Sequence, residues 1–97
     1  MVRIQLHDTR TISTSSGMFL TLHYYLLKNI SRSYVTYGIK ISSISDIPSK
    51  PDIHSEQVSN LSYSFTHTLA LLDLCVEHLV TPTDLFTSLD TLMNEGF

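Results

Sequence analysis

The sequence predicts an α+β domain, in which an antiparallel β-hairpin or three-stranded sheet packs against one long and one short α-helix. Two observations lead to this prediction. Apolar side chains alternate with polar ones in the first half of the chain, which is typical of strands with one buried face. In the second half they recur at spacings of three and four residues, which is typical of helices. The length of 97 residues predicts a single domain over 1–97.

The first strand is predicted where apolar residues alternate in "VRIQLH". Val2, Ile4 and Leu6 alternate with Arg3, Gln5 and His7, and this period of two fits a half-buried strand. The residues that follow, 8–17, are polar and end in glycine, so they predict a loop.

A β-hairpin is predicted over 18–44, because two runs rich in aromatic and β-branched residues flank the short polar segment "NISRS". The more continuous apolar face should lie toward the core. It contains Leu20, Leu22, Tyr24, Leu26, Val35, Tyr37, Ile39 and Ile41. The opposite face should be wetter, and it contains His23, Tyr25, Tyr34, Thr36 and Lys40. Gly38 leaves a gap on that face where another backbone or a ring could approach.

A linker is predicted over 45–54, where Pro48 and Pro51 oppose both regular pairing and helix. The long helix is predicted over 55–80, with Ser55 as its N-cap. Its main apolar stripe contains Val58, Leu61, Phe65, Leu69, Leu72, Val76 and Leu79.

The short helix is predicted over 81–95, and "TPTD" marks its start. Thr81 is the expected N-cap, Pro82 suits the first helical position, and Asp84 can reach back to the N–H of Thr81. Gly96 is the expected stop.

Three motifs, "YYLL" at 24–27, "YGIKI" at 37–41 and "VTPTDLFTSLDTLMNE" at 80–95, give the chain a resemblance to a known family. It resembles short proteins of spore-forming, Gram-positive clostridial lineages (Firmicutes) that share a domain of unknown function, and the resemblance spans most of 19–95. It implies a stand-alone bacterial protein of the cytoplasm. It brings no catalytic residue, ligand or partner, and the Ser/Thr-rich start and the weakly charged long helix depart from the family's pattern.

Composition limits the function classes. Charged residues make up 15% of the chain, against a usual value of about 25%, which suggests that another chain covers some apolar surface. The net charge of −3 and the scattered Lys and Arg disfavour nucleic-acid binding. No apolar run approaches the roughly twenty residues of a membrane span. The expected location is therefore the cytoplasm.

No catalytic, cofactor or metal site is predicted. His67 and His78 lie eleven residues apart on the expected helix, or about 16 Å at 1.5 Å per residue, which is too far for one ion. Ser64, His67 and Asp73 do not share a helix face, and no glycine-flanked turn presents a nucleophile. The single cysteine, Cys75, is expected to be a small buried side chain. We therefore expect a protein that is not an enzyme.

A second stripe on the long helix is the first candidate interaction surface, and it contains Tyr63, His67, Leu71, Leu74 and His78. Either residues 85–93 of the same chain or a second copy could cover this stripe. The wetter sheet face, with His23, Tyr25, Tyr34 and Lys40, is the second candidate. The leading prediction is a non-enzymatic interaction or regulatory module, homodimeric or bound to a protein partner. The alternative is a small-ligand-binding protein with a pocket between the hairpin and the long helix, near Tyr24, Tyr37 and Phe65.

Overall fold

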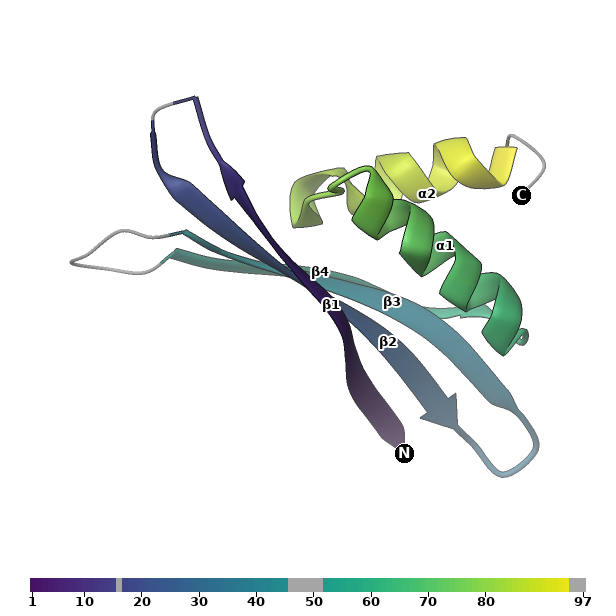
Figure 1. Ribbon diagram of the computed structural model, residues 1–97. Coiled ribbons are helices and arrows are strands. Elements are labelled where there is room, and N and C mark those ends of the chain that lie inside the picture. Colours follow the sequence, from purple (N-terminus) through teal and green to yellow (C-terminus); the bar gives the residue numbers. More distant parts are fainter. Residues whose placement is uncertain (16, 46–51, 95–97) are drawn as a thin grey trace.

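The computed structural model describes residues 1–15, 17–45 and 52–94, and it shows a sheet with a helical layer on one side (Figure 1). The strands form one antiparallel sheet in the order β1-β2-β3-β4. In chain order the elements are β1 (Val2–Ser13), β2 (Phe19–Ile30), β3 (Val35–Ser45), β4 (Asp52–Ser62), α1 (Phe65–Glu77), the 3₁₀ turn η1 (Pro82–Asp84) and α2 (Leu85–Asn94). The predicted α+β class is confirmed, but the sheet has four strands instead of two or three.

The central hairpin forms as predicted. β2 and β3 pair from Leu20 opposite Ser45 to Ile30 opposite Val35. Their inward side chains make the core together with both helices, because the two most regularly alternating runs of the sequence lie side by side. The buried core cluster contains Leu22, Tyr24, Leu26, Ile39, Ile41, Leu71, Leu72, Cys75, Val76, Val80, Leu85 and Leu89. Val35 and Tyr37, also predicted to face the core, are half-buried.

The first strand is longer than predicted. The expected loop over 8–17 is wrong for residues 8–13, because β1 continues to Ser13 and pairs with β2 as far as Phe19. Threonine is a good strand former, and the ladder with β2 supplies hydrogen bonds that an isolated polar segment would lack.

The fourth strand replaces the start of the predicted long helix. Residues 52–62 pair with β3, and Ser55 lies opposite Ser42 instead of capping a helix. Val58 and Leu61 contact the core from this strand, so their helix-like spacing was a coincidence of two strand positions. Of the predicted linker, residues 46–51 lie outside the described residues, and 52–54 belong to β4.

The first helix begins at Phe65, ten residues after the predicted start. Its N-cap is Ser64, whose hydroxyl accepts a 3.1 Å hydrogen bond from the N–H of His67. The helix ends at Glu77, and Leu79 takes a positive φ of 53° in the connection that follows. No helix within the described ranges is long and apolar enough to cross a membrane.

The second helix begins where "TPTD" predicts. Thr81 has the extended backbone of an N-cap and Pro82 occupies the first helical turn, although that turn is 3₁₀. The predicted capping contact differs, because the Thr81 hydroxyl donates to the Asp84 carboxylate at 3.1 Å. The expected stop at Gly96 lies outside the described residues.

Candidate interaction surface

One face of the sheet carries both helices, and no other described element forms a layer over the opposite face (Figure 1). We call that opposite side the outer face. The strand registers assign to it Val2, Ile4, Leu6, Thr9, Thr11, Ser13, Phe19, Thr21, His23, Tyr25, Leu27, Asn29, Thr36, Gly38, Lys40, Ser42, Ile44, Ile53, Ser55 and Gln57.

The edge strand β1 has its apolar side on the outer face, away from the helices. The alternation predicts a half-buried strand, yet its apolar side chains Val2, Ile4 and Leu6 are 58%, 53% and 52% exposed. The polar side, with Arg3 and Gln5, faces the helical layer instead. β1 therefore presents to solvent the side chains that an alternating strand normally buries.

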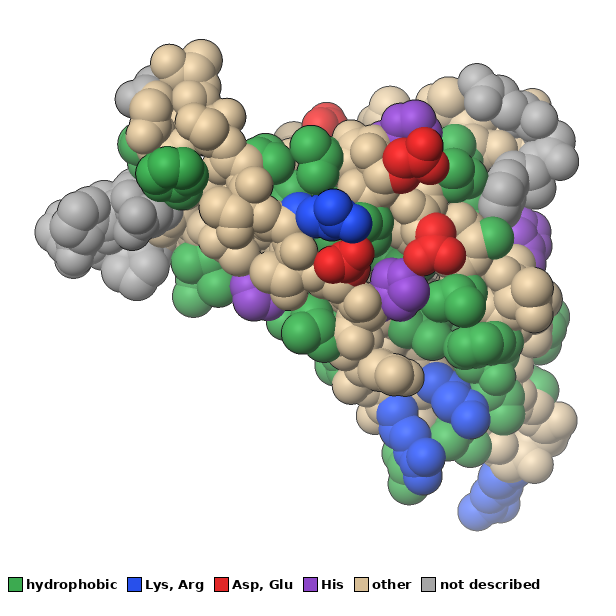
Figure 2. Space-filling view, in the orientation of Figure 1, with side chains coloured by type: hydrophobic (Ala, Val, Ile, Leu, Met, Phe, Trp, Pro, Cys, Tyr) green, Lys and Arg blue, Asp and Glu red, His purple; other side chains and the backbone are tan. Residues whose placement is uncertain are grey.

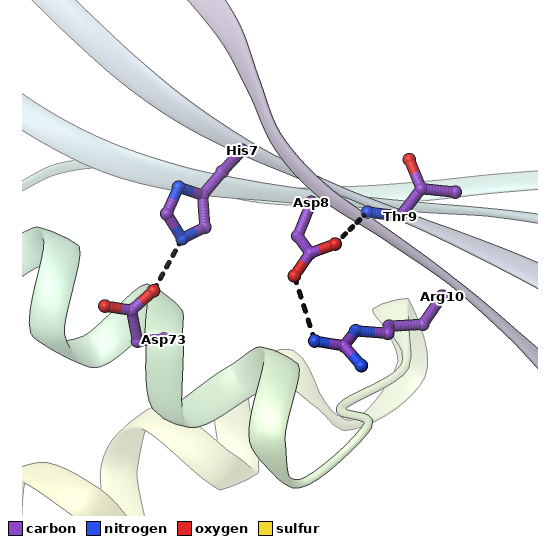
Figure 3. A network of polar contacts seen from close by, with 5 residues as sticks. All are labelled: His7, Asp8, Thr9, Arg10 and Asp73. Carbon is purple, nitrogen blue, oxygen red and sulfur yellow. Dashed lines mark hydrogen bonds and ion pairs between the residues drawn. The ribbon is translucent and has the colours of Figure 1, made fainter.

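A β-bulge and a polar network fix this orientation. The register of β1 against β2 shifts between Leu6 and Asp8, so that both His7 and Asp8 point toward the helical layer (Figure 3). His7 Nε2 lies 2.6 Å from Asp73 Oδ1 on α1. This contact ties the edge strand to the helix and leaves Ile4 and Leu6 on the outer face.

Asp8 accepts two further hydrogen bonds in the network, from the N–H of Thr9 at 2.7 Å and from the Arg10 guanidinium at 3.1 Å (Figure 3). The N–H of Thr9, with help from Arg10, holds the pKa of the Asp8 carboxyl below its ordinary value. Acidic, basic and His side chains gather over this part of β1 and α1 (Figure 2).

The outer face is nearly uncharged. Lys40 is the single Lys, Arg, Asp or Glu among the residues assigned to it. Its ammonium lies 5.7 Å from the centre of the Tyr25 ring, and that ring stacks on His23 at 6.3 Å. Two strongly exposed apolar side chains, Phe19 and Ile53, extend the face beyond this aromatic group. Depletion of charge together with exposed aromatic and aliphatic groups is the compositional mark of an interface core.

In the middle of the outer face, residues of β4 fill the space beside β3. Gly38 faces the carbonyl oxygen of Val58, so the predicted gap is filled by the backbone of β4. Asn60, with a positive φ of 54°, accepts hydrogen bonds from the side chains of Thr36 and Asn29. The outer face is therefore an ordered surface that includes part of β4.

The helical stripe predicted as an interaction surface does not form one exposed face. Leu71 is fully buried in the core cluster, which includes residues of α2. Of the two alternatives, Leu71 is therefore covered by residues of the same chain. His67 and Leu74 are half-buried, and His78 is the exposed C-cap of α1. Tyr63 precedes the helix and is strongly exposed. It contacts Tyr34 edge-on at 5.9 Å, beside the neighbouring ends of β3 and β4, a pairing that sequence spacing did not reveal.

A pocket of about 230 Å³ lies on the opposite, helix-bearing side of the sheet. Tyr37 and Phe65 lie in its wall with their rings edge-on at 5.6 Å. Tyr24, expected beside them, does not line it, because its hydroxyl is buried and donates to the carbonyl of Val80 at 3.0 Å. The lining residues are Arg3, Gln5, Leu26, Lys28, Tyr37 and Phe65.

The candidate nucleophiles are in unreactive positions. Burial raises the pKa of the Cys75 thiol to about 11, so the thiol is protonated near neutral pH. Ser64 is engaged as a helix cap, and Asp73 contacts His7. Among the described residues no three His, Cys, Asp or Glu side chains gather as metal ligands would.

The fold and this surface define a small α+β domain with one helix-covered and one open sheet face. The chain belongs to a family of unknown function (DUF6514), whose family model matches residues 3–95. No curated protein and no solved structure shows a significant match to the chain.

Proposed function

We propose that the protein is a non-enzymatic interaction module that acts as a homodimer, and that a second copy covers the outer face. The observation that carries the proposal is the edge strand β1, on which Val2, Ile4 and Leu6 are each more than half exposed. An alternating strand whose apolar side faces water in the isolated chain is accounted for if that side is buried between two copies.

The charge of the outer face favours a second copy as the partner. With Lys40 as its single charged residue, the face offers almost nothing to a strongly charged partner. A second copy always supplies a matching uncharged, apolar face. A two-fold axis would bring the two faces together as sheets pack in a sandwich, about 10 Å apart.

The size of the face also fits a dimer. Strands of 11 and 12 residues are about 36–40 Å long at 3.3 Å per residue, and four strands are about 19 Å wide, giving roughly 700 Å². Two such faces would bury at most about 1,400 Å², since Leu27, Thr36 and Ser42 are already buried within the chain, and this maximum lies within the range of specific protein interfaces.

The mass of the protein in solution tests the proposal. Light scattering at micromolar concentration should give twice the chain mass of 11.0 kDa. Leu6→Lys and Ile4→Lys should each reduce the mass to one chain while leaving the helical circular-dichroism signal unchanged, because both side chains are already half-exposed in the single chain. A wild-type mass of 11.0 kDa at all concentrations would overturn the homodimer.

Phe86→Lys is the matched control. Phe86 is 55% exposed, about as much as Leu6, but lies on α2 on the other side of the molecule. It should leave the dimer intact, and Leu74→Glu, which tests the helical stripe, should do the same. If either Phe86→Lys or Leu74→Glu dissociates the dimer while Leu6→Lys remains dimeric, the interface lies on the helices. That result would contradict the proposal that the outer face forms the dimer.

We propose as a second candidate function that the protein binds a small ligand. The pocket beside Tyr37 and Phe65 supports it, since it lies where the hairpin meets the first helix. A thermal-shift screen of small metabolites should give stabilising compounds, and a screen without any would count against this function.

The group of organisms and the cellular location of the protein are proposed from the resemblance alone. The "YYL", "YGI" and "VxPxxL" motifs support a clostridial, Firmicutes origin and a place in the bacterial cytoplasm. Neither proposed function requires bond-making by the protein.

A further inference from the structure

The pocket on the helix-bearing side is lined by two cationic side chains that directly oppose each other. Arg3 on β1 is the register partner of Lys28 on β2, and both line the pocket. Like charges directly opposite across a ladder are destabilising. Neither residue has an ion pair within residues 1–15, 17–45 and 52–94, where the acidic partners found belong to His7, Arg10 and His54.

The rest of the pocket is apolar and aromatic. Leu26, Tyr37 and Phe65 provide a wall in which the two rings meet edge-on. Phe65 is also the first residue of α1, and the first turn of that helix holds no acidic side chain. The positive end of the helix dipole therefore lies beside the two cations without a negative group in that turn to offset it.

We propose that this pocket binds a small organic anion, with its carboxylate between Arg3 and Lys28 and its apolar body against Tyr37 and Phe65. An anion would relieve the repulsion of the opposed cations and accept charge-assisted hydrogen bonds from both. The pocket volume of about 230 Å³ lies below the ~300 Å³ at which pockets for drug-sized ligands begin, so the ligand has the size of a single ring or a short chain.

The inference rests on the second candidate function and adds the chemical class of the ligand. It is independent of the dimer, because Arg3 and Lys28 lie on the opposite side of the sheet from the outer face. Several Lys and Arg side chains lie at the end of the molecule that carries the N-terminus, while another lies among the acidic side chains near α1 (Figure 2).

Benzoate, benzyl alcohol and inorganic phosphate are the probes for the test. In an NMR titration of the full chain, benzoate should shift the amide resonances of Lys28, Tyr37 and Phe65. It should bind more tightly than the neutral alcohol, which has the same ring, and more tightly than phosphate, which has charge without a ring. Lys28→Gln should weaken benzoate binding about tenfold or more, because it removes a charge-assisted contact.

Arg32→Gln is the matched control, since Arg32 is exposed in the turn after β2 and does not line the pocket. It should leave benzoate affinity unchanged. Lys28→Gln should also melt no lower than wild type without ligand, because it relieves the repulsion with Arg3, and benzoate should no longer raise its melting temperature. If Lys28→Gln fails to fold, Arg3→Gln on the exposed edge strand is used in its place.

The outcomes separate the inference from the function on which it rests. Equal binding of benzoate and benzyl alcohol would overturn the anion site and leave a small-ligand pocket in place. Phosphate binding as tight as benzoate would overturn the role of the aromatic wall. If no probe binds, and the metabolite screen is also silent, the second candidate function fails together with the inference.

Discussion

The hydroxyl of Tyr24 donates a 3.0 Å hydrogen bond to the carbonyl oxygen of Val80, 56 residues further along the chain. The bond is buried, and it joins the centre of the sheet to the connection between α1 and η1. The carbonyl of Val80 lies just beyond the end of α1, where no further helical turn supplies a donor. Tyr24 therefore acts both as a core side chain and as the partner of a buried backbone group.

Tyr24→Phe should reduce the free energy of unfolding by about 1–2 kcal/mol, because the ring remains packed but the carbonyl of Val80 loses its donor. Urea denaturation followed by circular dichroism measures the change. Tyr37→Phe is the control, since no hydrogen bond of its hydroxyl is found within the described residues, and it should cost clearly less. Equal stability of wild type and Tyr24→Phe would contradict a structural role for the bond.

The free energy of unfolding should fall at alkaline pH because of two buried groups, the Tyr24 hydroxyl and the Cys75 thiol. Burial raises the pKa of Tyr24 from 10.0 to about 12 and that of Cys75 from 9.0 to about 11. Because both pKa values are raised by folding, the unfolded chain deprotonates first. Their contribution is intact below about pH 9 and is lost as the pH rises toward about 12.

Two pKa units correspond to a loss on the order of 2–3 kcal/mol for the Cys75 thiol. Tyr24 should contribute less, because part of its shift comes from the negative charge of a deprotonated Cys75. Denaturation midpoints measured between about pH 8 and pH 12 should show the decline. Tyr24→Phe should remove the part between pH 10 and about 12, and Cys75→Ala the part between pH 9 and about 11. An unchanged pH profile in both variants would mean that other groups cause the alkaline loss.

Gly38→Ala should destabilise the pairing of β3 with β4. A Cβ at this position would overlap the carbonyl oxygen of Val58 and lie 3.0 Å from the Cα of Ser59, so the backbone of β4 must move. We expect a loss of about 1–3 kcal/mol, as for other overpacked sites. Amide hydrogen exchange should become faster in β4 first.

Gly17→Ala provides the comparison. Gly17 has a φ of +82°, but a Cβ added there would meet no other atom within 4 Å, so alanine costs backbone strain without a clash. Its effect should be confined to the β1–β2 connection. If Gly38→Ala leaves exchange in β4 unchanged, the close approach of Val58 does not restrict this position.

The hairpin and the start of the second helix were predictable because local pattern and tertiary contacts agree there. Leu22, Tyr24 and Leu26 alternate over a length that no helix pattern fits as well, and all three are in the core. At "TPTD" the missing N–H of Pro82 and the backbone of Thr81 permit a helix start with little dependence on the surroundings.

β4 could not be predicted because its local pattern and its tertiary environment disagree. Val58, Leu61 and Phe65 follow helical spacing, and Ser55 is an acceptable cap in sequence. Pairing with β3 satisfies the backbone of both strands, and strand preference depends strongly on such context. Ser64, equally able to cap, then starts the helix after the sheet edge is complete.

The open face was only half predictable. Alternation in β1 predicts a strand with two unlike sides, but it does not say which side meets the helices. That choice depends on the bulge at Leu6 and Asp8 and on the contact of His7 with Asp73, and both need the three-dimensional register. His23, Tyr25 and Lys40 were placed correctly on the less buried face because β2 and β3 have an unambiguous core side.

The contact between His7 and Asp73 should hold β1 against α1 without contributing much to global stability. The two side chains are 27% and 62% exposed, and exposed pairs of this kind are worth about 0.2–1 kcal/mol. A double-mutant cycle with His7→Ala and Asp73→Ala should give a coupling energy in that range. Because β1 is an edge strand, its loss should appear mainly as local opening.

Hydrogen exchange provides the local measurement. Amides of β1 should exchange faster in Asp73→Ala, while those of β2 and β3 stay protected, because the central hairpin keeps its own core. Glu77→Ala is the matched control, as Glu77 is an exposed acidic residue one turn further along the same helix and has no ion pair among the described residues. Unchanged exchange in β1 would show that the ladder with β2 alone holds the edge strand in place.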